Sequence, residues 1–573
     1  MNKALVTIYV LGPSLLALAC SDDGGQNTNP NTAGTTLGVT SDVGPTTAGP
    51  TTGGPTTGAT GAAGTVTGTS GAQTVTTGST GTSVGTGGAS STVTGTVGTA
   101  VGTTTGTTGG GGDSSVTSDT TATSTTGAPA EPEPTLVTSG QGNYWVVGEV
   151  TETTGAANVT VNEGQTFQDW IGWGGTFNEA GWDALKAVSA EDRDHAIRLL
   201  FDKVDGIGFT HARIPIGSSD YGLNRYSLAE TPNDWEMKDF SIDRDRQDLI
   251  PYIHAALKVN PSIKFWASPW SPPPWMKDNN AFDRGNMKGD DQTLDAHALY
   301  LARFVEEYAA EGIVIEAIHP QNEPGYAQDY PSCLWSGSVM ADYIANHLGP
   351  LFEQRLPNTE VWLGTMSNPN DSNIVSTVMG DAKARSYVKG IALQWGMGDG
   401  NLPSQYSSQY QIPIMQSEHK CGNYPWEGGN ANLAPNDHAY AEESWGFFKN
   451  WIGKNVNSYM AWNMVLDTVG RNLDNVRPWA QNALIAVDRN AGQLKVTPTY
   501  YLFRHMAQYV EPGAVRIGIQ GGDGFAFKNP DGSIVTILYN QGGQPADTTL
   551  AVSGTTLQFT IPARGWATVN WQG

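Results

Sequence analysis

Short apolar segments alternate with helix-like segments about eight times along the middle of this chain, a count that bears directly on fold class. The segments that favour strands are rich in β-branched and aromatic residues, and apolar residues recur at helical spacing between them, most clearly over residues 295–311. The expected strands are residues 167–175, 209–216, 263–268, 313–318, 360–364, 391–395, 412–416 and 458–462. This alternation predicts an α/β fold with parallel strands, and eight such units predict a (β/α)8 TIM barrel over residues 166–505.

The pattern changes near residue 497, where apolar and polar residues begin to alternate between turns of Gly, Pro and Asn. Alternation with a period of two predicts antiparallel strands, so we expect a β-sandwich side domain over residues 506–573. Residues 141–165 also favour strands and are expected to join the same sheet. An independent carbohydrate-binding module is the alternative. No linker-like sequence precedes Val515, which favours a domain fused to the barrel.

Residues 1–20 favour an export signal, because a lysine precedes a mostly apolar stretch that is too short and too interrupted to span a membrane. The stretch ends at Cys20 in a sequence that resembles a bacterial lipoprotein cleavage box, although Ala17 stands where Leu is usual. We therefore expect an exported protein held at an outer membrane or cell surface by a lipid on Cys20. A plain secretory signal with an incidental cysteine is the alternative.

Residues 21–140 consist mainly of Thr, Gly, Ser, Ala and Val, and no Lys or Arg occurs between Lys3 and Lys186. Such a segment has too few large apolar side chains for their burial to offset the entropy lost on ordering. We expect a disordered tether that separates the folded part from the cell surface. A β-solenoid is the alternative, but the Thr-Gly spacing is irregular, whereas true repeats keep a fixed period.

The formal net charge of −24 argues against a nucleic-acid partner, because phosphate binding requires basic patches. A neutral carbohydrate is a more favourable partner than an anionic polysaccharide. We expect the chain to be a monomer.

Two glutamates lie where expected barrel strands end. Glu323 follows the fourth strand in a His-Pro-Gln-Asn-Glu-Pro segment, and Glu418 follows the seventh strand. Barrel enzymes carry their reactive groups at the carboxyl ends of the strands, and paired carboxylates suit glycosidic bond cleavage. Asn322 can donate to a sugar 2-OH in such a site. The alternative is that both are ordinary surface glutamates.

Cys333 and Cys421 each follow one of these glutamates at short distance, and with Cys20 they are the three cysteines of the chain. Three cysteines are too few for a disulfide-dense scaffold or a Cys-rich zinc site. Exported thiols tend to oxidise, so a disulfide between the two loops and a pair of free thiols are both open.

Five segments together resemble glycoside hydrolase family 30: residues 172–177, 212–221, 267–277, 319–324 and 461–467. The fourth of these carries the Asn-Glu-Pro acid/base signature of retaining barrel glycosidases. The resemblance covers residues 143–573. It implies a (β/α)8 barrel with a fused β side domain and a double-displacement mechanism with retention.

The resemblance also implies roles for individual residues. Glu323 would be the acid/base, Glu418 the nucleophile, and Arg213 the neighbour that keeps the nucleophile ionised. The residues implied in sugar contact are Asp220, Trp270, Asn322 and Trp462. Many relatives carry a tyrosine or another aromatic residue near the nucleophile at the sixth strand, where this chain has Gln394-Trp395-Gly396. That contact would be absent here, or supplied by Trp395 or Tyr326.

Some of these residues also have structural interpretations. Arg213 could be an ion-pair partner inside the barrel, and Asp467 could cap a loop. His319 and His419 lack the spacing of metal ligands, so we expect structural roles for both, and neither a metal nor an organic cofactor.

The sequence thus predicts a retaining β-glycoside hydrolase. The family includes glucosylceramidases, β-1,6-glucanases, β-1,6-galactanases and xylanases. We favour β-glucosyl linkages, in β-1,6-glucan or a glucosylceramide-like molecule. The alternatives are the same chemistry on β-1,6-galactan or xylan, and a surface protein that binds glycans without cleaving them.

Overall fold

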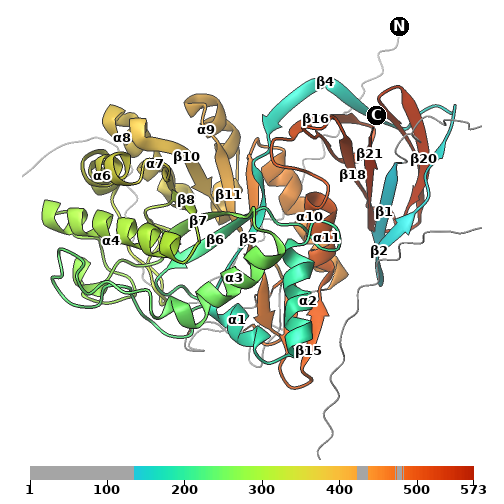
Figure 1. Ribbon diagram of the computed structural model, residues 1–573. Coiled ribbons are helices and arrows are strands. Elements are labelled where there is room, and N and C mark those ends of the chain that lie inside the picture. The colour runs from blue at the N-terminus through green and yellow to red at the C-terminus, as the bar shows by residue number, and fades with distance from the viewer. Residues whose placement is uncertain (1–133, 423–436, 471–472, 474–480, 482, 573) are drawn as a thin grey trace, which may run out of the picture. The chain divides into compact units, whose positions relative to one another are not determined.

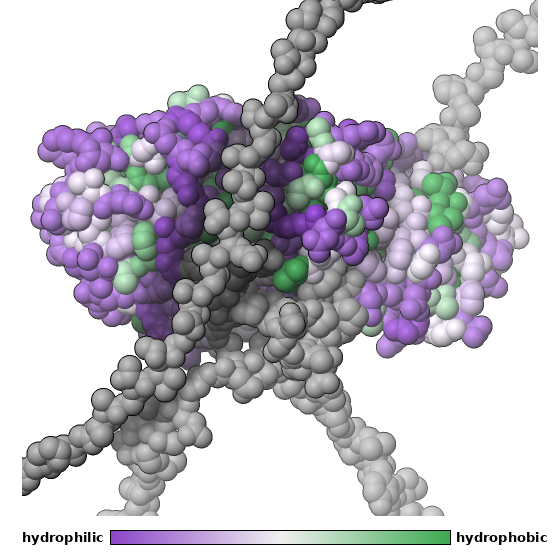
Figure 2. All heavy atoms as spheres, turned by 90° about the horizontal axis from the view of Figure 1, so that it is seen from below, coloured by the Kyte–Doolittle hydropathy of each residue, from purple (hydrophilic) through white to green (hydrophobic). Residues whose placement is uncertain are grey.

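The computed structural model describes residues 134–422, 437–470, 473, 481 and 483–572 (Figure 1). The predictions made for residues 1–20, and for almost all of the Thr/Gly/Ser-rich segment, therefore lie outside the described residues. Within the described part, no helix combines the length and the apolar composition needed to cross a membrane. Figure 2 shows one face of the molecule, and its surface is largely hydrophilic with small hydrophobic areas.

Eight parallel strands form a closed barrel, which confirms the expected fold class. The strands are β5 (Gly172–Thr176), β6 (His211–Ile216), β7 (Lys264–Pro269), β8 (Ile315–Ile318), β9 (Glu360–Met366), β10 (Val388–Leu393), β11 (Ile414–His419) and β12 (Ser458–Asn463). They follow chain order around the barrel, and β12 closes it by pairing with β5. Most of their residues are buried on both faces, as expected for a parallel sheet covered by helices.

Helices surround the barrel strands (Figure 1). They are α1 (Glu179–Leu185), α2 (Ala190–Phe201), α3 (Leu249–Val259), α4 (Asp291–Ala310), α5 (Gly337–Asp342), the π-helix η3 (Tyr343–Leu348), α6 (Gly349–Arg355), α7 (Ser372–Gly380), α8 (Ala382–Tyr387), α9 (Leu402–Tyr410), α10 (His438–Ile452) and α11 (Pro498–Ala507). Short 3-10 turns are η1 (Asp245–Gln247), η2 (Pro274–Met276), η4 (Pro369–Asp371) and η5 (Trp395–Gly398). Helix α4 begins earlier than its apolar spacing predicted, because the Asp290 side chain caps it by accepting from the backbone N–H of Thr293.

The side domain is a ten-stranded sheet that folds over its own apolar core. Its strands are β1 (Thr135–Gly140), β2 (Asn143–Gly148), β3 (Thr151–Glu152), β4 (Val159–Asp169), β16 (Val515–Gln520), β17 (Asp523–Lys528), β18 (Ile534–Asn540), β19 (Ala546–Val552), β20 (Thr555–Ile561) and β21 (Gly565–Trp571). All neighbouring strands in this sheet pair antiparallel except β19 and β4. A further three-stranded sheet, which the sequence did not suggest, contains β13 (Val465–Asp467), β14 (Ile485–Asp488) and β15 (Gln493–Val496).

The structure corrects two boundaries. The sheet begins with β1 at Thr135, inside the segment predicted as tether, where Leu136 and Val137 are buried. The Thr- and Ser-rich composition continues through this strand and hides it. The segment predicted as the first barrel strand, residues 167–175, contains the end of β4 and the start of β5. The two residues between these strands, Trp170 and Ile171, are apolar, so no typical turn residue marks the turn in the sequence.

The side domain is fused to the barrel, as expected. Trp170 packs against Phe527 of β17 with ring centroids 5.6 Å apart. His505 of α11 contacts the hydroxyls of Ser139 and Thr568, both at 2.8 Å. One apolar core therefore continues from the barrel into the inner face of the sheet.

Cys333 and Cys421 are both free and buried, so the disulfide considered between them is wrong. Each thiol contacts a backbone carbonyl of its own loop. The Cys333 Sγ lies 3.7 Å from the Leu334 oxygen, and the Cys421 Sγ lies 3.2 Å from the His419 oxygen.

Candidate active site

Glu323 and Glu418 converge at the carboxyl ends of the barrel strands. Glu323 lies in the loop after β8, and Glu418 is the penultimate residue of β11. The side-chain amide of Gln394, just after β10, donates to Glu323 Oε1 and to Glu418 Oε2, both at 3.2 Å. These two oxygens are therefore separated by no more than twice 3.2 Å. Retaining glycosidases need a carboxylate separation of about 5–5.5 Å, and two facing oxygens within this limit are compatible with that spacing.

Arg213 of β6 joins the two loops. Its side chain is fully buried, and its Nη1 donates to Glu418 Oε2 at 2.6 Å. Its Nη2 donates to Asn322 Oδ1 at 2.6 Å and to Ser268 Oγ at 2.9 Å. Arg213 is thus an ion-pair partner inside the barrel, and the carboxylate it pairs with is Glu418.

The two carboxyl groups have different electrostatic surroundings. Burial, followed by the negative charge of Glu418, raises the pKa of Glu323 to about 8. Burial also raises the pKa of Glu418, but the charge and hydrogen bond of Arg213 oppose that effect. Because the cation contacts Glu418, we assign the negative charge of the pair to Glu418 and the proton to Glu323 at neutral pH.

Hydrogen bonds to its side-chain oxygen fix the orientation of the Asn322 amide group. Its Oδ1 receives hydrogen bonds from Arg213 and from the hydroxyl of Thr365, the latter at 2.8 Å. The amide nitrogen therefore lies on the side of the group away from the guanidinium. An amide held in this way can donate to a sugar hydroxyl next to Glu323.

Trp395 contacts the second carboxylate, as one of the sequence alternatives anticipated. Its indole Nε1 donates to Glu418 Oε1 at 3.2 Å. Tyr326 lies in the loop after β8, where its backbone N–H donates to the backbone carbonyl of Glu323, and 38% of the residue is exposed. Trp395 and Glu323 both have left-handed backbone angles, with φ of 47° and 50°. Such angles are rare outside glycine and are concentrated at functional sites.

Sequence reasoning missed two contacting residues, Gln394 and Tyr330. The Tyr330 hydroxyl donates to Glu323 Oε2 at 3.2 Å. Gln394 is further held by Ser417, whose hydroxyl donates to Gln394 Oε1 at 2.9 Å. The position of Gln394 at a strand end could have identified it, because reactive groups gather there. Tyr330 lies in an irregular loop, and no local pattern marks it.

Trp270 and Trp462 stack on each other beside Arg213. Their ring centroids are 5.2 Å apart, and the Arg213 Cζ lies 4.2 Å from the Trp270 ring and 5.6 Å from the Trp462 ring. Both indoles are buried, so in this structure they pack against the Arg213 side chain and shield it from solvent. Burial and the charges of Glu418 and Glu323 raise the pKa of Asp220 well above its usual value, which places this carboxyl in the same electrostatic environment.

The other residues considered in the sequence, Asp467, His419 and His319, form contacts that support the fold. Asp467 accepts from the backbone of Val469 and Gly470, both at 3.0 Å, and pairs with Arg489. His419 contacts the Tyr459 hydroxyl at 2.9 Å. His319 stacks on Trp266 with centroids 4.2 Å apart, and burial lowers its pKa well below the usual value.

Comparison with known proteins identifies the family. Residues 171–510 match the glycosyl hydrolase family 30 TIM-barrel domain, and residues 513–569 match the family 30 beta sandwich domain. The chain is 27% identical over 423 residues to the lysosomal acid glucosylceramidase of Mus musculus, covering 70% of this chain and 80% of the relative. It is 24% identical over 395 residues to an endo-1,6-beta-D-glucanase of Neurospora crassa, covering 65% and 78%.

A solved structure shares the fold. An endo-beta1,6-glucanase superposes with a TM-score of 0.68 and 23% sequence identity, covering 77% of this chain and 99% of the other. The matched barrel alone accounts for more than half of the sequence, and the matched sandwich follows it directly. The chain therefore belongs to glycosyl hydrolase family 30 and is a glycoside hydrolase that acts on carbohydrate.

Proposed function

We propose that this hydrolase cleaves β-glucosides with retention, with Glu418 as nucleophile and Glu323 as acid/base. The observation that carries the proposal is the Gln394 amide, which contacts both carboxylates and so limits their separation. Their close approach supports direct attack by a carboxylate, because a retaining pair lies closer together than an inverting pair, which holds a water between its carboxylates.

In the first step Glu323 protonates the leaving oxygen while Glu418 attacks the anomeric carbon and forms a glycosyl ester. The ester is neutral, so Glu418 no longer contributes the charge that raises the pKa of Glu323. The pKa of Glu323 falls, and the now ionised carboxylate accepts a proton from the water that releases the sugar.

The pairing of the carboxylates supports hydrolysis over simple glycan binding. Arg213 stabilises the ionised form of Glu418, which a nucleophile requires. The relatives named as a glucosylceramidase and an endo-1,6-beta-D-glucanase both support a β-glucosyl substrate. Product analysis on glucosylceramide, β-1,6-glucan, β-1,6-galactan, xylan and an aryl β-glucoside tests this choice. Reducing sugar from galactan or xylan alone would contradict it.

Replacing Glu418 with Ala tests the assignment of the nucleophile. We expect Glu418→Ala to lose turnover of an aryl β-glucoside by several orders of magnitude, because no glycosyl ester forms. Azide should restore activity with an α-configured glucosyl azide, since the small anion attacks once from the vacated side. The Glu323→Ala variant is the matched control, and with an activated leaving group its azide product should be β-configured. An unimpaired Glu418→Ala variant would contradict the proposal.

We also propose a cellular location and an oligomeric state for this protein. We place the enzyme outside the cytoplasm as a monomer, attached through a lipid on Cys20. The apolar stretch before Cys20 and the long Thr/Gly/Ser-rich segment after it support this arrangement.

A further inference from the structure

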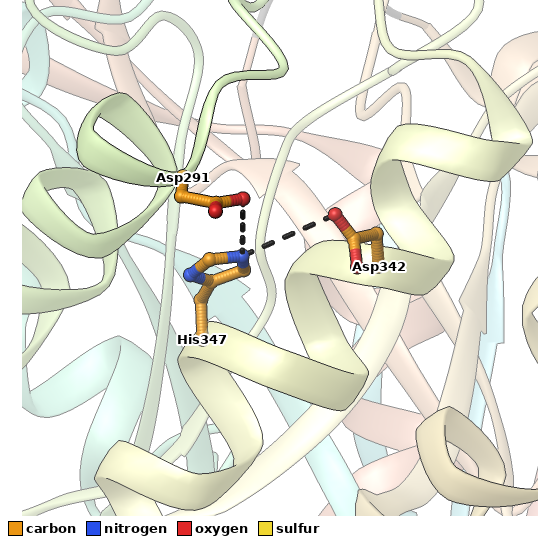
Figure 3. A group of neighbouring side chains, drawn as sticks. All are labelled: Asp291, Asp342 and His347. Carbon is orange, nitrogen blue, oxygen red and sulfur yellow. Dashed lines mark ion pairs between the residues drawn. The ribbon is translucent and has the colours of Figure 1, made fainter.

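A His–Asp–Asp cluster lies on the outside of the barrel, away from the paired glutamates. It consists of Asp291, the first residue of α4, Asp342, the last residue of α5, and His347 of η3 (Figure 3). One ligand atom from each residue lies within 4.8 Å of the others. We infer that these three side chains bind a divalent transition-metal ion, with Zn²⁺ as the ion that best suits one imidazole and two carboxylates.

The histidine is oriented for coordination by its neighbour Asp295. The Asp295 Oδ1 lies 2.7 Å from His347 Nδ1, so this carboxylate accepts the ring N–H. The Nε2 atom then carries the lone pair. Carboxylate–histidine–metal arrangements of this kind fix the tautomer and the ring orientation of zinc ligands.

Asp342 is oriented in a similar way. Asn346 donates to Asp342 Oδ1 at 2.6 Å, and the other carboxylate oxygen faces His347. Asp342 and His347 are five residues apart, and a regular α-helix would separate them by roughly 140° around its axis. The π-helical turn brings residues at this spacing closer to one face. Pro350 at the start of α6 cannot donate to Asn346, which accounts for the wider turn just before it.

The distances between the ligand atoms suit an ion better than a hydrogen bond. His347 Nε2 lies 4.0 Å from Asp291 Oδ1 and 4.0 Å from Asp342 Oδ2. These distances are longer than hydrogen bonds, which are about 2.7–3.2 Å, and tetrahedral zinc bonds of about 2.0–2.2 Å place ligand atoms roughly 3.4 Å apart, so the exposed Asp291 and Asp342 side chains would close on the ion by roughly half an ångström. Figure 3 shows Nε2 directed at both carboxylates. His347 is only 9% exposed, so more than nine-tenths of this residue is buried behind the gap.

Such an ion would join α4 to the α5–η3 segment, and water would complete its coordination because Asp291 is exposed. The competing account is direct pairing of His347 with the aspartates without any metal. The cluster was not visible in the sequence because its residues come from two separate segments, α4 and α5–η3, and form no contiguous motif.

Zinc binding to the full-length chain, stripped of metal with a chelator, tests the inference by calorimetry. We expect saturable binding of Zn²⁺ at this site and a melting temperature that rises with Zn²⁺, because the ion binds the folded state. Asp291→Asn and His347→Gln should each weaken binding at least tenfold and reduce the thermal shift. The Asp291 side chain is 91% exposed, so its replacement does not threaten folding.

Two further variants sharpen the experiment. Asp295→Ala should weaken zinc binding about tenfold to a hundredfold through the histidine it orients. His195→Gln, which alters an exposed histidine on α2, should bind Zn²⁺ like the unmodified chain. The inference is overturned if the chain shows no saturable zinc binding, or if Asp291→Asn and His347→Gln both bind like the unmodified chain.

Discussion

Gln394 is the residue that links the two glutamates of the proposed catalytic pair. Its amide donates to a carboxylate oxygen on each glutamate, and Ser417 holds the other end of the amide. These hydrogen bonds oppose the effect of burial on the pKa of both carboxyl groups. Gln394 therefore positions the glutamates and also tunes them, although it has no titratable group.

We expect Gln394→Met to lower kcat/KM about tenfold to a hundredfold, since a hydrogen bond to a charged group contributes about 1.5–3 kcal/mol. Without the amide the pKa of both glutamates rises, so the pH–rate profile should move to higher pH. Kinetics across pH measure both effects. A lower kcat/KM with an unchanged pH–rate profile would indicate that the substitution damages packing and that Gln394 does not tune the glutamates.

The pH dependence itself follows from the charge assignment. Activity requires a protonated Glu323 and an ionised Glu418, so kcat/KM should fall above about pH 8 as Glu323 loses its proton. It should also fall in acid as Glu418 is protonated. Glu323→Gln, measured on an aryl glucoside that needs no acid, should lose the fall on the basic side. If that variant retains the same basic fall, another group is responsible for it.

At the scale of elements, the β4–β5 connection carries the chain from the side domain into the barrel. Trp170 lies at this turn, between Trp173 at 4.6 Å and Phe527 at 5.6 Å, measured between ring centroids. The buried Trp170 ring thus packs against both the parallel barrel and the mostly antiparallel side domain. The turn was not apparent in the sequence because Trp170 and Ile171, the residues that form it, are apolar and are not typical turn residues.

Trp170→Ala should lower the free energy of unfolding by about 3–5 kcal/mol, because it leaves a large cavity where the domains meet. Denaturant unfolding monitored by circular dichroism measures the change. Phe167→Ala, in β4 just before the turn, is a matched control and should cost much less, because Phe167 is 39% exposed. Equal losses of unfolding free energy in the two variants would mean that Trp170 contributes no more to stability than the half-exposed Phe167 does.

At the scale of the whole molecule, the chain joins a folded enzyme to a long N-terminal segment of different composition. The proposed lipid on Cys20 would tether the enzyme, and the acidic net charge of −24 suits an uncharged substrate. The proposed active-site residues all belong to the described part of the chain, so attachment and catalysis should be separable.

Cys20→Ser tests this separation in a bacterial host that processes lipoproteins. We expect the unmodified chain in the membrane fraction with incorporated labelled palmitate, and the variant in a soluble fraction without label. Activity on an aryl β-glucoside should be the same in both, because Cys20 lies far outside the catalytic part of the chain. Identical fractionation of both forms would refute the lipid anchor.

The sequence by itself determined the order of strands and helices, the period-two strands of the side domain, and the strand ends that carry Glu323 and Glu418. These features depend on residues a few positions apart, and local periodicity records them. Only the tertiary structure decided that Gln394 and Tyr330 contact the glutamates, and that Asp291 meets His347. Closure of the barrel and the course of its loops bring these residues together across long stretches of chain. Burial at that meeting point, which no local pattern encodes, then sets the pKa of Glu323.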